Sequence, residues 1–177
     1  AVNGLLVPSG TGWQLKPRGD ADFEMSAPVI PISRVRSTQV GKVVFLDGKV
    51  LTSMSAALGS VFGDSTIHVS DTSGSIRVTR VRPLNLAVGD SVRCVGTVAV
   101  SDGQKVVDGA TAFRLGASFA PIPRTVTTAQ AAGASSGTLD AALVRIDSAR
   151  ISDTTTRVGE LVISVSDGSG SLEIKID

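Results

Sequence analysis

Few side chains in this chain are suited to catalysis. It has one histidine, His68, and one cysteine, Cys94. His68 falls on the polar side of an alternating segment, so we expect an exposed strand residue; a general base would need a nucleophile and an orienting group beside it. Cys94 alternates in phase with valines, which predicts a buried apolar residue more than a reactive thiol. The sequence therefore predicts no enzymatic activity and no cofactor.

Four aspartates in segments rich in glycine and serine are the candidate metal ligands. They are Asp71, Asp102, Asp153 and Asp167. A calcium ion needs about six or more converging oxygens, and the spacing of an EF-hand loop is absent. Aspartate and glycine favour tight turns for reasons of backbone geometry alone. We therefore expect turns at these positions and no metal site.

Cationic side chains offer partial support for nucleic-acid binding. The candidates are Arg77, Arg80, Arg82 and Arg93. However, 17 lysines and arginines stand against 16 aspartates and glutamates, and the net charge is only +1. Binding to a polyanion depends on a concentrated cationic surface, so the balanced charge argues against nucleic acid as the main partner. Solvated strand faces are the plainer explanation of these arginines.

Aromatic residues are scarce, at 3% of the chain, so few platforms exist on which a base or sugar could stack. Trp13, with Lys16 and Arg18 nearby, is one such platform. A large aromatic side chain is also valuable in a small core, and we expect Trp13 to fill the core or the rim of a barrel.

No apolar run approaches the roughly 18 residues that indicate a membrane span.

An internal repeat organises the second half of the chain. The segment VVFLDGKVLTS from Val43 matches LVRIDSARISD from Leu143, at an offset of 100 residues. Further on, VSDTSGSIRV from Val69 matches VSDGSGSLEI from Val165, at an offset of 96. Two matching blocks in the same order indicate a repeated unit. The second unit carries Glu173 where the first has an arginine, which weakens the idea of a repeated basic groove.

A second match joins the N-terminus to the end of the first unit. Ala1 to Met25 resembles residues 95–115, with a short apolar strand, a polar turn and a second strand in each. The offset falls from 93 at the start of the match to 90 at its end. This change predicts a slightly longer turn in the N-terminal copy.

Alternating apolar residues and frequent turn signals predict an all-β chain. Asp47-Gly48 is one such signal and predicts a hairpin turn. The connectors contain prolines and are expected to be extended, with one or two helical turns after Thr127 or Thr128 in the second. The expected parts are a donor hairpin at 1–25, a linker at 26–39, a complete domain at 40–115, a linker at 116–138 and an incomplete domain at 139–177.

Three strands, a break and two closing strands resemble the OB-fold, and the proline-linked tandem arrangement is similar to that of secreted prokaryotic proteins. This resemblance implies two small OB-like five-stranded barrels and an extracellular or cell-surface location. It also implies an alternative function, as a binding module for single-stranded nucleic acid or glycan, although fold alone does not determine function.

The incomplete domain needs two more strands, and the N-terminal hairpin needs a core. The hairpin of another subunit would complete the second barrel by strand addition, giving a head-to-tail homopolymer and a structural filament. Closure within one chain, or a sequence taken from a longer array, are the alternatives. The expected donor residues are Val2, Leu5, Val7, Trp13 and Leu15, and the expected acceptor residues are Leu143, Ile146, Ile163, Val165, Leu172 and Ile174.

Overall fold

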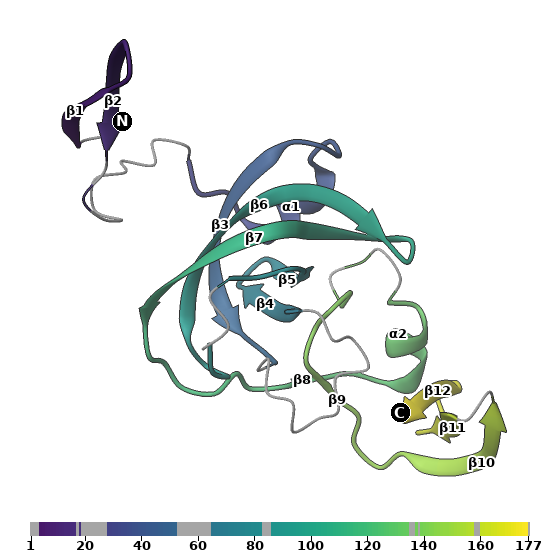
Figure 1. Cartoon of the computed structure of the whole chain (residues 1–177). Helices are drawn as coiled ribbons and strands as arrows, with labels where there is room; N and C mark the ends of the chain where they lie inside the picture. The colour runs from purple at the N-terminus through teal and green to yellow at the C-terminus, as the bar shows by residue number, and fades with distance from the viewer. Residues whose placement is uncertain are drawn as a thin grey trace.

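The computed structural model describes residues 4–16, 18, 28–52, 65–82, 86–134, 137, 139–157 and 160–176. Over this part of the chain the protein is all-β, as expected, and it has two short helices (Figure 1). The elements in chain order are β1 (Leu5–Ser9), β2 (Gly12–Lys16), α1 (Ile32–Ser37), β3 (Val43–Val50), β4 (Ile67–Asp71), β5 (Gly74–Val78), β6 (Ser91–Ser101), β7 (Gln104–Gly116), β8 (Arg124–Thr125), α2 (Thr128–Ala132), β9 (Val144–Arg145), β10 (Arg150–Arg157), β11 (Glu160–Ser166) and β12 (Leu172–Ile176).

Strands β3 to β7 form a closed barrel in the order β3-β4-β5-β7-β6. Neighbouring strands are antiparallel except β5 and β7, which are parallel. A five-stranded barrel in which the third and fifth strands lie side by side has the arrangement of an OB-like fold. The break expected after the third strand lies between β5 and β6.

The core of the barrel follows the alternation seen in the sequence. Inward-facing residues of β4, β5 and β6 have no more than 1% of their surface exposed; they include Ile67, Val69, Ile76, Val78, Val92, Cys94 and Val98. Burial raises the pKa of the Cys94 thiol to about 12, with a smaller contribution from Asp47. The thiol is therefore protonated at neutral pH and unreactive.

Helix α1 is a correction to the expected extended connector. Ile32 and Val35 are fully buried and belong to the barrel core. Pro31 precedes the helix as its N-cap, where a proline needs no backbone N–H donor. Prolines in a connector favour an extended backbone, but Pro31 lies at the one place in a helix that tolerates it, the start.

Asp47-Gly48 was wrongly predicted to form a hairpin turn. Strand β3 runs straight through both residues, which pair with Arg93 and Val92 of β6. Glycine is required at position 48 for a different reason. A Cβ atom there would lie 2.5 Å from the Val69 side chain and 2.7 Å from the Ser70 carbonyl oxygen.

The C-terminal elements form smaller sheets in this structure. Strands β10, β11 and β12 make a three-stranded antiparallel sheet, and β8 and β9 make a short parallel pair (Figure 1). Helix α2 begins as expected, since the Thr127 side chain caps it and Gln130 completes a capping box. Among the described helices, none is long and apolar enough to cross a membrane.

Gly96 lies at a shift in the β6–β7 register, and a Cβ atom there would be 2.6 Å from the Val107 side chain and 3.0 Å from the Asp108 carbonyl oxygen. We predict that Gly96→Ala lowers the free energy of unfolding by roughly 1–3 kcal/mol, because the added methyl overpacks the barrel. Urea denaturation would measure the loss. Gly116→Ala is the matched control, since nothing lies within 4 Å of its Cβ position; equal losses in both variants would contradict the explanation.

Candidate subunit interface

The side chains with potential for catalysis or metal binding do not converge. In the part of the chain that the structure describes, no three histidine, cysteine, aspartate or glutamate residues are grouped to hold a metal ion. His68 is half-buried rather than exposed, a correction to the expectation from its polar neighbours. Its Nδ1 atom lies 3.1 Å from the Thr52 hydroxyl oxygen. Burial lowers its pKa, and the charge of Arg77 lowers it further.

Three of the four candidate nucleic-acid-binding arginines are engaged by aspartates. Arg77 bonds to Asp102 at 2.9 Å, and Arg80 bonds to Asp108. Arg93 donates two hydrogen bonds of 2.7 Å to Asp47, from its Nε and Nη2 atoms. The pairing with Arg80 lowers the pKa of Asp108 to about 2. These contacts neutralise most of the expected basic surface, and Asp102 acts in one of them besides lying in a turn.

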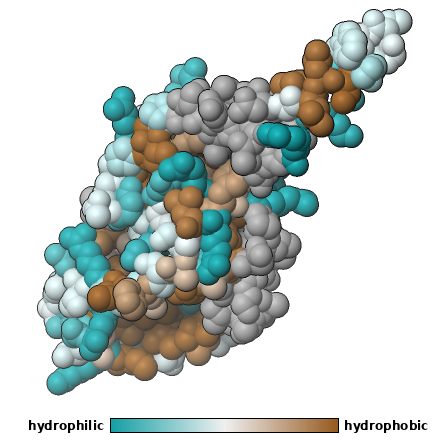
Figure 2. Space-filling view, turned by 90° about the vertical axis from the view of Figure 1, so that its left-hand side faces the viewer, coloured by the Kyte–Doolittle hydropathy of each residue, from teal (hydrophilic) through white to brown (hydrophobic). Residues whose placement is uncertain are grey.

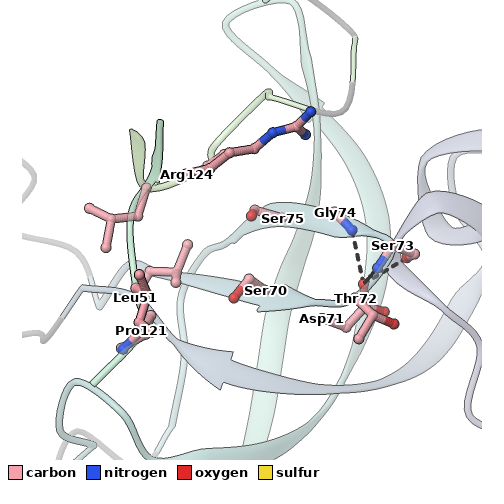
Figure 3. Close-up of a pocket in the computed structure, with 12 residues that line it drawn as sticks. Leu51, Ser70, Asp71, Thr72, Ser73, Gly74, Ser75, Pro121 and Arg124 are labelled. Atoms are coloured by element: carbon pink, nitrogen blue, oxygen red, sulfur yellow. Dashed lines mark hydrogen bonds between the residues drawn. The ribbon is translucent and has the colours of Figure 1, made fainter. Parts of the chain in front are cut away.

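Asp71 is a turn residue, as predicted, and it also anchors a helix. Its Oδ1 atom accepts hydrogen bonds from the backbone N–H groups of Ser73 at 2.6 Å and Gly74 at 3.0 Å (Figure 3). Its Oδ2 atom accepts a bond of 2.8 Å from the N–H of Ile32, the first residue of α1. The β4–β5 turn therefore holds the helix that closes the barrel.

Asp167 makes the corresponding contacts between the β11–β12 turn and α2. It accepts bonds from the N–H of Ser169 at 2.9 Å, the N–H of Thr128 at 3.1 Å and the hydroxyl of Thr128 at 2.7 Å. Thr128 lies 96 residues after Ile32, and Asp167 lies 96 residues after Asp71. The repeat seen in the sequence thus extends to the preceding helix.

The pairing of β4 with β5 repeats in the same register in the second unit. In the barrel, Ile67 pairs with Val78 and Val69 with Ile76. In the second unit, the pairs 96 residues further on are Ile163 with Ile174 and Val165 with Leu172. A parallel bridge between Val29 and Phe45 likewise matches the pair Thr125–Arg145. The second unit therefore contains counterparts of α1, β4 and β5, and β9 matches the first part of β3. The following strand β10 pairs with β11 one residue further along than β3 pairs with β4, since Arg150 lies opposite Ser166.

Residues that are buried in the barrel are more exposed in the second unit. Ile67, Val78 and Leu46 are fully buried, whereas their counterparts Ile163 and Ile146 are half-buried and Ile174 is 40% exposed. Of the other expected acceptor residues, Val165 is buried and Leu172 is half-buried. Leu143 is 37% exposed, and its counterpart Val43 is 62% exposed in the complete barrel. Leu143 therefore occupies an outer position rather than a core position.

The N-terminal hairpin β1–β2 matches the tip of the β6–β7 hairpin pair for pair. All five of its pairs have a counterpart 92 residues further on: Leu5–Lys16 and Thr97–Asp108, Leu6–Leu15 and Val98–Val107, Val7–Gln14 and Ala99–Val106, Pro8–Trp13 and Val100–Lys105, Ser9–Gly12 and Ser101–Gln104. Both loops contain two residues, so the longer turn predicted for the N-terminal copy was wrong. Gly10 takes φ +55° at the first loop position, which glycine adopts without strain.

This register decides which side chains share a face. Leu6 and Leu15 are cross-strand partners, and Trp13 lies on the same face because strand residues two apart point the same way. Leu5 and Val7 lie on the opposite face. Sequence reasoning therefore missed Leu6, and the constant offset of 92 residues, which also aligns Gly4 with Gly96, was the signal that would have found it. Val2 lies outside the described residues.

The hairpin carries apolar side chains that nothing covers in this structure. Leu6 is 63% exposed, Trp13 68% and Leu15 47%, and the hairpin projects clear of the barrel (Figures 1 and 2). The C-terminal sheet also carries an exposed apolar side chain, Ile174. In this structure the hairpin does not pair with the C-terminal sheet.

A separate groove of about 310 Å³ lies beside the β4–β5 turn, between that turn and the segment from Pro121 to Arg124 (Figure 3). A neighbouring hollow is lined in part by Phe119 and Ile122, which are 90% and 92% exposed. These are the features of the barrel surface that resemble a ligand site.

The fold is that of a small OB-like β-barrel protein. Comparisons with known proteins do not assign it to a family. No family model and no curated protein matches the sequence. The chain is similar in structure to the hypothetical protein ygiW from E. coli, with 20% identity, a TM-score of 0.41, and coverage of 51% of this chain and 92% of that chain.

Two further solved structures are similar at comparable scores. One is described as "Structural mimicry for functional antagonism", with 10% identity, a TM-score of 0.40, and coverage of 61% of this chain and 63% of that chain. The other is described as "Molecular basis for abrogation of activation of pro-inflammatory cytokines", with 14% identity, a TM-score of 0.43, and coverage of 78% and 76%. The fold class therefore rests on the strand order of the barrel itself.

We predict that Asp167→Asn releases α2 from the β11–β12 turn. Hydrogen bonds from the Ser169 hydroxyl and N–H, and then from Thr128, lower the pKa of Asp167 in the folded protein. Its stabilising effect is therefore present above the ordinary carboxyl pKa of 3.8 and is lost as the pH falls below that value.

Hydrogen exchange of the Thr128 amide should report this effect. At about pH 6 the Asn variant should exchange faster than the parent protein, and the difference should shrink toward about pH 2. Asp153→Asn is the control, because the Asp153 side chain is exposed and bonds only to the adjacent Thr154 N–H among the described contacts. An unchanged Thr128 amide in the Asp167 variant would contradict the assigned role.

Proposed function

We propose that this protein is a structural subunit that polymerises head to tail, with the β1–β2 hairpin of one copy completing the C-terminal unit of the next. The observation that carries the proposal is the five-pair match between β1–β2 and the tip of β6–β7. The C-terminal unit has counterparts of α1, β4 and β5, and the hairpin resembles the two strands that would close a barrel around them.

Burial of apolar surface supplies the driving force. Each large aliphatic side chain taken from water into a core contributes roughly 1.5–3 kcal/mol before ordering costs. Leu6 and Leu15 on the hairpin, Ile163 and Ile174 on the C-terminal sheet, and Ile146 just after β9 are all incompletely buried in the single chain. A hairpin alone is marginal in water, and pairing it with sheet edges satisfies backbone groups as well.

Chain order supports donation between copies. Strand β7 is followed by a connector that leads to α2 and the next unit, and β2 is followed in the same way by a connector that leads to α1. By this correspondence the hairpin belongs to a unit that precedes the first barrel, as the C-terminal unit of a second copy would. Such a heterologous contact builds an open filament unless its rotation closes a ring.

An extracellular or cell-surface location is part of the same proposal. It is supported by the similarity of the repeated, proline-linked units to the tandem OB-like modules of secreted prokaryotic proteins. A non-enzymatic role agrees with the dispersed arrangement of His68, Cys94 and the described aspartates.

We predict that the intact protein forms filaments visible by electron microscopy and that a variant lacking residues 1–25 does not. The truncated protein keeps the complete barrel, whose core contains no residue of the hairpin. It accepts a hairpin but cannot donate one, so a small proportion mixed with intact protein should shorten the filaments. Monomers of the intact chain at every concentration would overturn the proposal and indicate closure within one chain.

A second candidate function is an OB-type binding module for single-stranded nucleic acid or glycan. The groove beside the β4–β5 turn favours it, because OB-folds bind ligands across their second and third strands. Phe119, almost fully exposed, offers a stacking platform near that groove.

We predict no saturable binding of a single-stranded oligonucleotide at micromolar protein, because aspartates engage Arg77, Arg80 and Arg93. Fluorescence anisotropy at about 50 mM and about 200 mM salt would test this. Tight binding that weakens steeply with salt, and that Phe119→Ala reduces while Val100→Ala does not, would favour the binding module instead. Val100 is a suitable control, since it is 55% exposed on the distant β6–β7 tip.

A further inference from the structure

Resting on the proposed polymerisation, we infer the register of the contact between copies. Strand β1 of one copy lies antiparallel to the β9 region of a second copy, with Leu5 opposite Leu143. Strand β2 lies parallel to β12, with Leu15 beside Ile174. The partner is thus a second copy of this chain, seated in one register.

The first contact follows from the pairing of β6 with β3. In the barrel, Thr97 pairs with Val43 and Gly96 with Val44. Leu5 of the hairpin corresponds to Thr97, 92 residues further on. Leu143 of the second unit corresponds to Val43, 100 residues earlier. One edge of β9 is occupied by β8, as the counterpart edge of β3 is bridged by Val29. The other edge of β9 corresponds to the edge of β3 that pairs with β6, and it is this edge that β1 occupies in the inferred contact.

The second contact follows from the pairing of β5 with β7. In the barrel, Val78 lies beside Val107 in a parallel pair. Their counterparts are Ile174 and Leu15. Strand β12 is the outer strand of its sheet, so a parallel neighbour can be added there. This places Leu15 over the apolar face that includes Ile163, half-buried, and Ile174, 40% exposed in the single chain.

Gly4 has a specific role in this register. Its counterpart Gly96 lies at the bulge where β6 crosses close to β7, and a Cβ atom there would collide with Val107. Bulges bend a strand and strengthen its twist, which a closed barrel of five strands requires. Glycine at position 4 allows β1 to bend over Leu15 in the same way.

Trp13 provides a reporter of the contact. Its counterpart Lys105 reaches past the end of α1 and donates a 2.8 Å hydrogen bond to the Thr38 carbonyl oxygen. The counterpart of Thr38 is Ala134, just after α2. Trp13 therefore comes to lie at the rim of the completed barrel, near the end of α2. It is the one tryptophan of the chain, so its emission reports assembly directly.

Disulfide trapping tests the register. Leu5→Cys and Leu143→Cys are introduced together, since directly opposed residues have Cβ atoms about 4.5–5.5 Å apart, close to the reach of a disulfide. Both counterparts are outer positions of the barrel, so the changes spare the core. The native Cys94 is buried and does not compete. The control combines Leu5→Cys with Arg145→Cys, which is displaced by two residues on the same face.

Mild oxidation of assembled Leu5/Leu143 protein should give a ladder of linked dimers and larger species, and the Leu5/Arg145 protein should give far less. Filaments with equal or stronger linking in the Leu5/Arg145 protein, or filaments that do not link at all, would overturn the register and leave polymerisation standing. Linked monomers at every dilution would overturn both, because the hairpin would then close on its own chain.

Substitutions on the two faces of the hairpin give an independent measurement. Leu6→Ser should raise the critical concentration roughly 10- to 100-fold, since Leu6 enters the core. Val7→Ser, on the opposite face, should change it by less than about threefold. The blue shift of Trp13 emission on assembly measures both. A larger effect of Val7→Ser than of Leu6→Ser would overturn the register.

Discussion

Closure of a five-stranded barrel is the constraint on which this structure depends. Strands β3, β4 and β5 make a curved three-stranded sheet. The β6–β7 hairpin pairs with β3 on one side and β5 on the other and, together with α1, covers the apolar face of that sheet. The same sheet elements recur at the C-terminus without that hairpin beside them. Where the hairpin is present, Ile67 and Val78 are fully buried, and where it is absent their counterparts Ile163 and Ile174 are half-buried and 40% exposed.

A second recurring device is the aspartate that joins a hairpin turn to a helix. Asp71 and Asp167 each use one carboxylate to satisfy the N–H groups of their own turn and the first N–H of the preceding helix. These bonds hold the helix and the hairpin turn together in both units.

A structural and a binding role make different demands on the same fold. The proposed polymer subunit needs an apolar donor, an open acceptor and one register, and the proposal assigns these parts to β1–β2 and to the C-terminal unit. A ligand module needs an accessible groove with free polar or aromatic groups. The groove beside β4–β5 provides space, and Phe119 lines the neighbouring hollow, but aspartates engage Arg77 and Arg80 of the barrel.

The sequence by itself determined the all-β class, the repeat, the buried alternation of β4 and β6, and the hairpin at the N-terminus, because these follow from local periodicity and from matching segments. Tertiary structure decided what local patterns leave open. Gly48 serves a close approach between strands instead of a turn, Pro31 begins a helix that fills the barrel, and His68 is half-buried. Leu6, and not Leu5, shares a face with Leu15, since a shift of one residue moves every side chain of a strand to the other face, and only cross-strand pairing fixes that shift.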